Sequence, residues 1–171
     1  MLHSIGNIRD VKTVLAIANQ AIEDSDVLDD LLSILIHGKI REQYMASWIL
    51  SRAVELHSEI LHESAHTTCL KAINATKEGG IKRNLIRIWQ FSIPESESTQ
   101  LEVLDKALNF LSDGSQDVAV RVFSITVLER LLKYFPEIKE EVIFLLEREY
   151  SQAKPSFKVR ADRFFKAASK L

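Results

Sequence analysis

Residues 116–133 read QDVAVRVFSITVLERLLK, and this stretch decides the fold. Its apolar residues recur at spacings of three and four, which predicts an α-helix. Near its start a valine precedes an arginine, at Val120 and Arg121. A step that recurs at a fixed period indicates repeated structural units. The same apolar–basic step is found at Ile40-Arg41, Ile81-Lys82 and Val159-Arg160, so that the basic residues are separated by 41, 39 and 39 residues.

Helical periodicity extends over most of the chain and is interrupted at intervals by residues that favour turns. The chain has only 5 Gly and 3 Pro, too few for a β-fold with many hairpins. We expect Gly79-Gly80 to close the fourth helix, and Thr99 and Glu102 to form a capping box for the sixth. The predicted helices cover about 7–23, 27–37, 40–56, 58–77, 81–91, 99–113, 116–135 and 137–153, and a ninth begins at Pro155.

The helices after the first one pair into hairpins, with approximate repeats at 27–56, 58–92, 98–135 and 137–170. A single helical hairpin cannot bury its own apolar face, so hairpins stack and share a core. The sequence therefore predicts an all-α fold, a right-handed α-solenoid of about four hairpins plus an N-terminal helix. Its 171 residues are the size of one domain, and we expect a single domain over 1–171.

The stretch 116–133 resembles the second helix of a HEAT repeat, in which an aspartate precedes a Val-Arg pair and then small and aliphatic residues. The resemblance implies that Asp117 and Arg121 form ladders between neighbouring repeats, and that the second helices line a concave groove. The chain also resembles a group of small bacterial HEAT-like proteins, at residues 46–51 and 158–171. Some of that group carry an adenylosuccinate lyase label. We do not expect that activity, because the sequence contains nothing like the serine-rich catalytic loop of those enzymes.

We expect a cytoplasmic protein that does not associate with a membrane. Cys69 is the only cysteine, so no disulfide forms within the chain. Residues 1–14 lack the basic and apolar regions of a secretory signal. No apolar run approaches the roughly 20 residues that span a bilayer.

Residues 62–66 read HESAH and match the HExxH pattern of zinc hydrolases. On a helix, His62 and His66 lie one turn apart and are able to share a metal, while Glu63 activates a water molecule. A catalytic zinc needs a third protein ligand, and none follows at a suitable spacing. We therefore expect these histidines to flank the apolar stripe of their helix near the surface, with no metal, no cofactor and no catalytic residue. A metal-dependent hydrolase is the third hypothesis.

A basic surface is the other candidate site. Arg83, Arg87, Arg130, Lys158 and Arg163 all lie on predicted second helices, which face the groove. The resemblance to HEAT-like DNA alkylation repair glycosylases implies a basic groove of this kind for nucleic acid. Trp48 and Trp89, each seven residues after a basic step, are able to stack on bases, but we expect both to be mostly buried between hairpins.

The distribution of charge limits the nucleic-acid hypothesis. The net charge is -2, and it divides into -4 over residues 1–80 and +2 over residues 81–171. Only one end of a groove built from all the hairpins is then basic, so binding to DNA or RNA is expected to be weak. We expect a non-catalytic scaffold or adaptor that binds a protein partner through its concave groove. Nucleic-acid binding through the basic second helices is the alternative.

Overall fold

The computed structural model describes residues 5–171, and within that range it contains helices and loops but no strand. The all-α fold class is therefore confirmed. Two short 3-10 helices, η1 (Ile5–Asn7) and η2 (Pro136–Ile138), accompany the α-helices. The α-helices are α1 (Val11–Glu23), α2 (Ser25–His37), α3 (Ile40–Leu56), α4 (Glu63–Ala75), α5 (Gly79–Ile88), α6 (Glu97–Ser112), α7 (Val118–Leu131), α8 (Lys139–Tyr150) and α9 (Pro155–Ala168).

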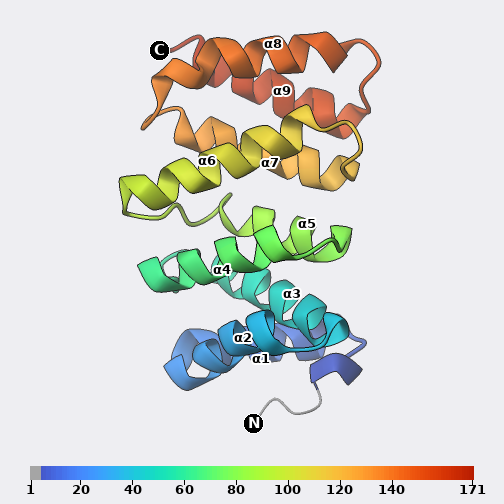
Figure 1. The fold of residues 1–171 in the computed structure, drawn as a ribbon, viewed down its shortest axis with the longest axis vertical. Coiled ribbons are helices and arrows are strands. Elements are labelled where there is room, and N and C mark those ends of the chain that lie inside the picture. Colours follow the sequence, from blue (N-terminus) through green and yellow to red (C-terminus); the bar gives the residue numbers. More distant parts are fainter. Residues whose placement is uncertain (1–4) are drawn as a thin grey trace.

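The helices form a two-layered stack, with α1 and α9 towards opposite ends (Figure 1). The even-numbered helices α2, α4, α6 and α8 pack on one another in sequence and make the first layer. The odd-numbered helices α1, α3, α5, α7 and α9 do the same and make the second layer. This is the arrangement of an α-solenoid, as the period of about 40 residues predicted.

The two layers differ in how closely their helices approach. Successive helices of the second layer pack more extensively on one another than successive helices of the first layer. In a curved stack the inner helices are brought together and the outer ones are spread apart. The closer packing of the second layer is what the expected concave groove along the second helices requires, and the candidate basic residues lie on helices of this layer.

Two predicted helix boundaries were wrong around residues 57–80. The helix expected over 58–77 begins only at Glu63 and ends at Ala75. The segment before it is a loop that connects the two layers, and Leu61 in this loop is buried. Gly79 and Gly80 do not close that helix but form the first turn of α5.

The reason for the two glycines is the close approach of other helices. A Cβ at Gly79 would collide with the carboxylate of Asp117, and a Cβ at Gly80 would lie 2.8 Å from the ring of Tyr44. Tyr44 belongs to α3 and Asp117 is the N-cap residue of α7, so α5 begins between its two second-layer neighbours. Here the missing side chains permit contact between helices.

The predicted capping box at Thr99 and Glu102 was also wrong. α6 begins at Glu97, and its N-cap residue is Ser96, whose hydroxyl oxygen accepts the backbone N–H of Thr99. Thr99 itself lies inside the first turn and is buried. Asp10 and Asp24 cap α1 and α2 in the same manner, through bonds to Thr13 N–H and Asp26 N–H.

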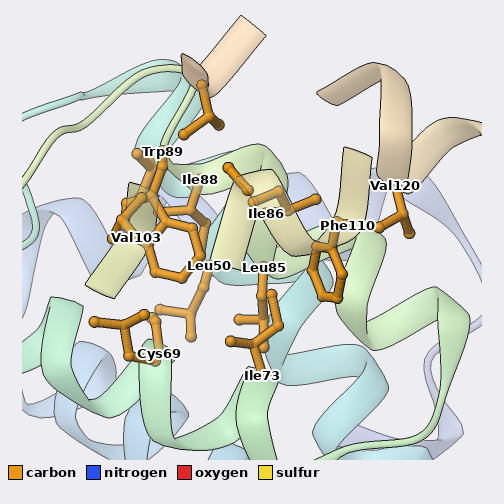
Figure 2. Packing of buried hydrophobic residues seen from close by; sticks show 14 of the residues in the cluster. Leu50, Cys69, Ile73, Leu85, Ile86, Ile88, Trp89, Val103, Phe110 and Val120 are labelled. Carbon is orange, nitrogen blue, oxygen red and sulfur yellow. The ribbon is translucent and has the colours of Figure 1, made fainter. Parts of the chain in front are cut away.

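A single apolar core runs between the two layers, and Trp89 is its largest fully buried side chain. Trp89 follows the last residue of α5 and packs in a cluster that includes Leu50, Cys69 and Val103 (Figure 2). The expectation of burial is thus confirmed for Trp89. Trp48, on the open side of α3, is partly buried and packs against the core, in accord with the expectation that it is mostly buried.

The burial of Trp89 predicts a large loss of stability on truncation. The substitution Trp89→Ala removes a side chain that is 0% exposed, and we expect it to lower the free energy of unfolding by about 3–5 kcal/mol. Urea denaturation followed by circular dichroism measures this change. Leu56→Ala, at a position 52% exposed, is the control and should change stability by less than about 0.5 kcal/mol. A loss below about 1 kcal/mol for Trp89→Ala would contradict the packing described here.

Candidate functional site

The HESAH segment lies at the start of α4 rather than in the middle of a helix. His62 is the N-cap residue and precedes the first helical residue, Glu63. The two histidines also lie in different surroundings, because His62 is exposed and His66 is 2% exposed. The expectation that both histidines flank the core near the surface was wrong for His66.

His66 takes part in a buried hydrogen-bonded group with Trp89 and Ser92. The indole Nε1–H of Trp89 donates to His66 Nδ1 at 3.2 Å. This bond leaves the proton of the neutral imidazole on Nε2, which lies 3.4 Å from the hydroxyl oxygen of Ser92. Both ring nitrogens therefore have partners within the protein, and the group ties α4 to the end of α5.

Glu63 is occupied by the main chain. Its carboxylate accepts the backbone N–H of Glu95 at 3.1 Å and that of Ser96 at 3.3 Å, so it fixes the loop that leads into α6. Burial raises the pKa of Glu63. The hydroxyl of Thr99 and the two backbone N–H groups outweigh this effect, and the pKa lies below its ordinary value. Glu63 thus acts as an ionised anchor between α4 and α6.

A cleft of about 460 Å³ opens beside these residues, and its lining includes Glu59, His62, Glu63, His66 and Ser92. Among residues 5–171, no three His, Cys, Asp or Glu side chains are grouped closely enough to hold a metal ion. A hydrolytic zinc needs three such ligands. The described side chains therefore provide no geometry for the chemistry that the HExxH pattern suggested.

Cys69 lies on α4, one turn after His66, and is fully buried. Burial raises the pKa of its thiol to about 12. A cysteine nucleophile reacts as the thiolate, which this environment disfavours. Cys69 acts as a small apolar side chain of the core.

Polar side chains connect successive helices of the second layer. Asp117 lies against Gly79, and Arg121 donates to the main-chain oxygen of Leu111 and to the carboxylate of Glu149 on α8. Arg121 thus links its own hairpin to the next one through the first-layer helix α8, whereas the ladder of Asp117 and Arg121 between repeats that the HEAT resemblance implied stays a prediction. Four further bonds run between second-layer segments: Asn84 to Ser47 at 3.1 Å, Arg87 to Ser51 at 2.9 Å, Arg130 to the Gln90 main-chain oxygen at 2.7 Å, and Arg160 to Thr126 at 2.9 Å.

The candidate basic residues have partners of their own. Arg87 is paired with Glu55 at 2.7 Å, and Arg163 is paired with Glu129 at 3.5 Å. Arg83 makes one long contact, 3.5 Å to the hydroxyl of Tyr44. Lys158 donates to the main-chain oxygen of Ser151, just after the end of α8. Arg83 and Arg87 lie together on α5, and Arg130 and Arg163 extend the series along α7 and α9.

The open face of α3 adds Tyr44, Arg52 and Glu55, which sequence reasoning did not assign to a site, to Arg41 and Trp48. Side chains at spacings of three and four follow one line along this helix, opposite its buried face. With Arg83 and Arg87 of α5 they form a continuous surface, which we call the α3–α5 patch. Its members are Arg41, Tyr44, Trp48, Arg52, Glu55, Arg83 and Arg87. The signal was present in the sequence as the spacing 41, 44, 48, 52 and 55.

The buried imidazole predicts a loss of stability in mild acid. The pKa of His66 is lowered from 6.5 to about 4, mainly by burial. The charge of Glu63 raises this pKa, and the nearby His62 lowers it. Between pH 6.5 and about 4 the unfolded chain binds a proton that the folded chain does not, so stability falls as the pH falls through this window. The shift corresponds to about 3 kcal/mol.

Urea denaturation at several pH values between 7.5 and 4 tests this expectation. His66→Asn retains an acceptor for Trp89 but has no titrating group, so its stability should fall less across the window than that of the wild type. His37→Asn, at an exposed position, is the matched control and should keep the wild-type dependence. Parallel pH profiles for the wild type and His66→Asn would show that His66 does not titrate in this way.

The comparisons with known proteins agree with this geometry. No curated protein matches the chain, and no solved structure matches it. Among residues 5–171, no helix has both the length and the apolar character needed to cross a membrane. The family model described as HEAT repeat domain matches residues 3–168. That match covers nearly the whole chain and accords with the two-layered helical stack, and the chain therefore belongs to the HEAT repeat domain family.

Proposed function

We propose that this protein is a non-catalytic scaffold that binds a protein partner across the open face of its second layer. HEAT repeats usually mediate interactions between proteins. Stacked repeats produce an extended concave surface, which suits a partner that is itself extended. The HExxH segment and Cys69 offer no competing reaction, because His66, Glu63 and the thiol are each committed to the internal structure.

The observation that carries this proposal is the set of polar bonds between second-layer helices. Asn84 to Ser47, Arg87 to Ser51 and Arg160 to Thr126 hold neighbouring helices in fixed register. A surface that is already ordered before binding loses less conformational entropy when a partner arrives. The second layer is therefore better ordered for binding than the first layer, whose helices pack less extensively on one another.

Nucleic acid is the less favoured ligand for the same face. Glu55 neutralises Arg87, and Glu129 lies within 3.5 Å of Arg163. Each phosphate contact requires a cation that is free to replace counterions, and tight non-specific binding takes roughly six to ten of them. Arg130 and Arg160 also donate to oxygens of the chain itself, so these cations are engaged within the protein before any phosphate arrives.

Charge reversal on the second layer should abolish partner binding. A tagged protein carrying Arg130→Glu and Arg163→Glu changes two surface side chains on α7 and α9, and we expect it to lose the proteins that the wild type retains in affinity purification from its native cells. The matched control is Lys71→Glu with Arg148→Glu, which makes the same change of charge at exposed positions on the first-layer helices α4 and α8. Equal loss with both double variants, or retention by the second-layer variant, would contradict this proposal.

Binding to nucleic acid should be weak at physiological salt. We expect dissociation constants no tighter than about 10⁻⁵ M for single- and double-stranded oligonucleotides, because several second-layer cations are already bonded to acidic side chains or to oxygens of the chain itself. Fluorescence anisotropy with labelled oligonucleotides at about 150 mM salt measures this. Submicromolar binding that charge reversal at Arg83, Arg87 and Arg163 removes would make nucleic acid the preferred ligand.

A further inference from the structure

The α3–α5 patch has the composition of a protein-binding hot spot. Residues that dominate binding energy at protein interfaces are most often tryptophan, tyrosine and arginine, and they lie near the centre of the contact. In this patch, Tyr44 and Trp48 lie on α3 with their ring centroids 6.4 Å apart. The guanidinium of Arg41 lies 5.6 Å from the centroid of the Tyr44 ring. Aromatic and arginine side chains are thus combined within two neighbouring helices.

Internal contacts hold the side chains of the patch in place. Arg41 donates to the main-chain oxygens of Gly6 and Ile8. Arg52 and Arg87 both bond to Glu55, and Arg87 retains only 19% of its side-chain exposure. Burial raises the pKa of Glu55, but the bonds from Arg87 and Arg52 lower it by more. The pKa of Glu55 is therefore below its ordinary value, and the carboxylate stays ionised. The patch therefore presents its charged groups without first having to order them.

The charge of the patch is one-sided although this half of the chain is acidic. It contains four arginines, at 41, 52, 83 and 87, and one carboxylate, Glu55. Arg83 has no carboxylate partner among the described residues, and its single side-chain contact is the 3.5 Å approach to Tyr44. Arg83 is half-buried and adjoins the side chain of Tyr44, whose ring lies beside that of Trp48. A guanidinium in such a setting is well suited to a bidentate bond with an incoming carboxylate.

We propose that the α3–α5 patch binds an acidic segment of a partner protein, with Arg83 as the main carboxylate contact and Trp48 and Tyr44 as the apolar contacts. The inference deepens the proposed scaffold function and rests on it. Charge complementarity carries the choice of ligand, because Arg52 and Arg87 share the single carboxylate of the patch, while Arg41 and Arg83 have no carboxylate partner among the described residues. The carboxylate accepts N–H bonds from Arg83, and the side chains beside it in the segment cover the exposed part of Trp48.

The arrangement of the rings favours a peptide over single-stranded nucleic acid. Bases stack on aromatic faces that are exposed and aligned along a groove. The planes of Tyr44 and Trp48 are inclined at 50°, and both rings are partly buried in the second layer. The cations of the patch also span only α3 and α5, whereas a nucleic-acid strand needs phosphate contacts repeated along its length.

The test uses the full chain and three labelled probes in fluorescence anisotropy. The probes are a short glutamate-rich peptide with a central leucine, the same peptide with lysine in place of glutamate, and an oligothymidylate of similar length. The wild type should bind the glutamate peptide more tightly than either of the others, and binding should weaken from about 50 mM to 200 mM salt. Arg83→Gln should weaken binding at least fivefold, which is about 1 kcal/mol.

The matched control is Arg148→Gln, which removes an arginine 50% exposed on first-layer helix α8. It should bind the glutamate peptide as the wild type does. The peptide contains no tryptophan, so binding should change the fluorescence of the wild type through Trp48. Trp48→Phe should lose that change, whereas the buried Trp89 contributes little to it. Circular dichroism confirms that each variant is folded.

Absence of glutamate-peptide binding, tighter binding of the oligothymidylate, or equal weakening by Arg83→Gln and Arg148→Gln would each overturn this inference. These outcomes are separate from the fate of the proposed function. If second-layer charge reversal at Arg130 and Arg163 removes a native partner while the peptide fails to bind, the scaffold function stands and only the assignment of the α3–α5 patch fails.

Discussion

The structure depends on how closely the helices of its second layer approach one another. Two helices come this near only where the side chains between them are small or absent. On α3 these are Ala46, Ser47 and Ser51, all buried, and at the start of α5 they are Gly79 and Gly80. The close approach then allows the longer side chains of α5 to reach across to α3. A hairpin that cannot bury its own apolar face is thereby held against the next one.

Polar groups in this crossing region serve both packing and recognition. A buried serine hydroxyl without a partner would be costly. Ser51 accepts a bond from Arg87, and Ser47 accepts one from Asn84 while it donates to the main-chain oxygen of Tyr44. The same bonds position Arg87, and with it Glu55, on the open side of the layer. On the other side of α5, Trp89 and His66 form the corresponding bond within the core. Function and stability are therefore coupled through the two faces of one short helix.

The repeat pattern allowed the fold to be predicted, whereas the contacts of individual side chains depended on tertiary structure. The period of about 40 residues predicted equivalent positions for four basic residues, and in the structure all four lie on second-layer helices: Arg41, Lys82, Arg121 and Arg160. Local patterns failed where contacts from distant segments decided the outcome. Glycines at 79 and 80 suggested a helix end, but α3 and α7 determine their role. The HExxH spacing of His62 and His66 did not indicate that Trp89 donates a hydrogen bond to His66. Likewise, the α3–α5 patch exists only because residues about 40 positions apart lie on adjacent helices.

The unequal packing of the two layers has a mechanical consequence. α4 and α6, and likewise α6 and α8, touch along a small area, whereas the second-layer helices are joined by both apolar contacts and hydrogen bonds. A force that bends the stack by spreading the first layer breaks few interactions, while a force that spreads the second layer must break many. We therefore expect anisotropic elasticity, in which bending the stack towards the second layer costs less free energy than bending it in the opposite direction. For a partner bound on the second layer, the easiest motion of the stack would be bending that brings the second-layer helices closer around it.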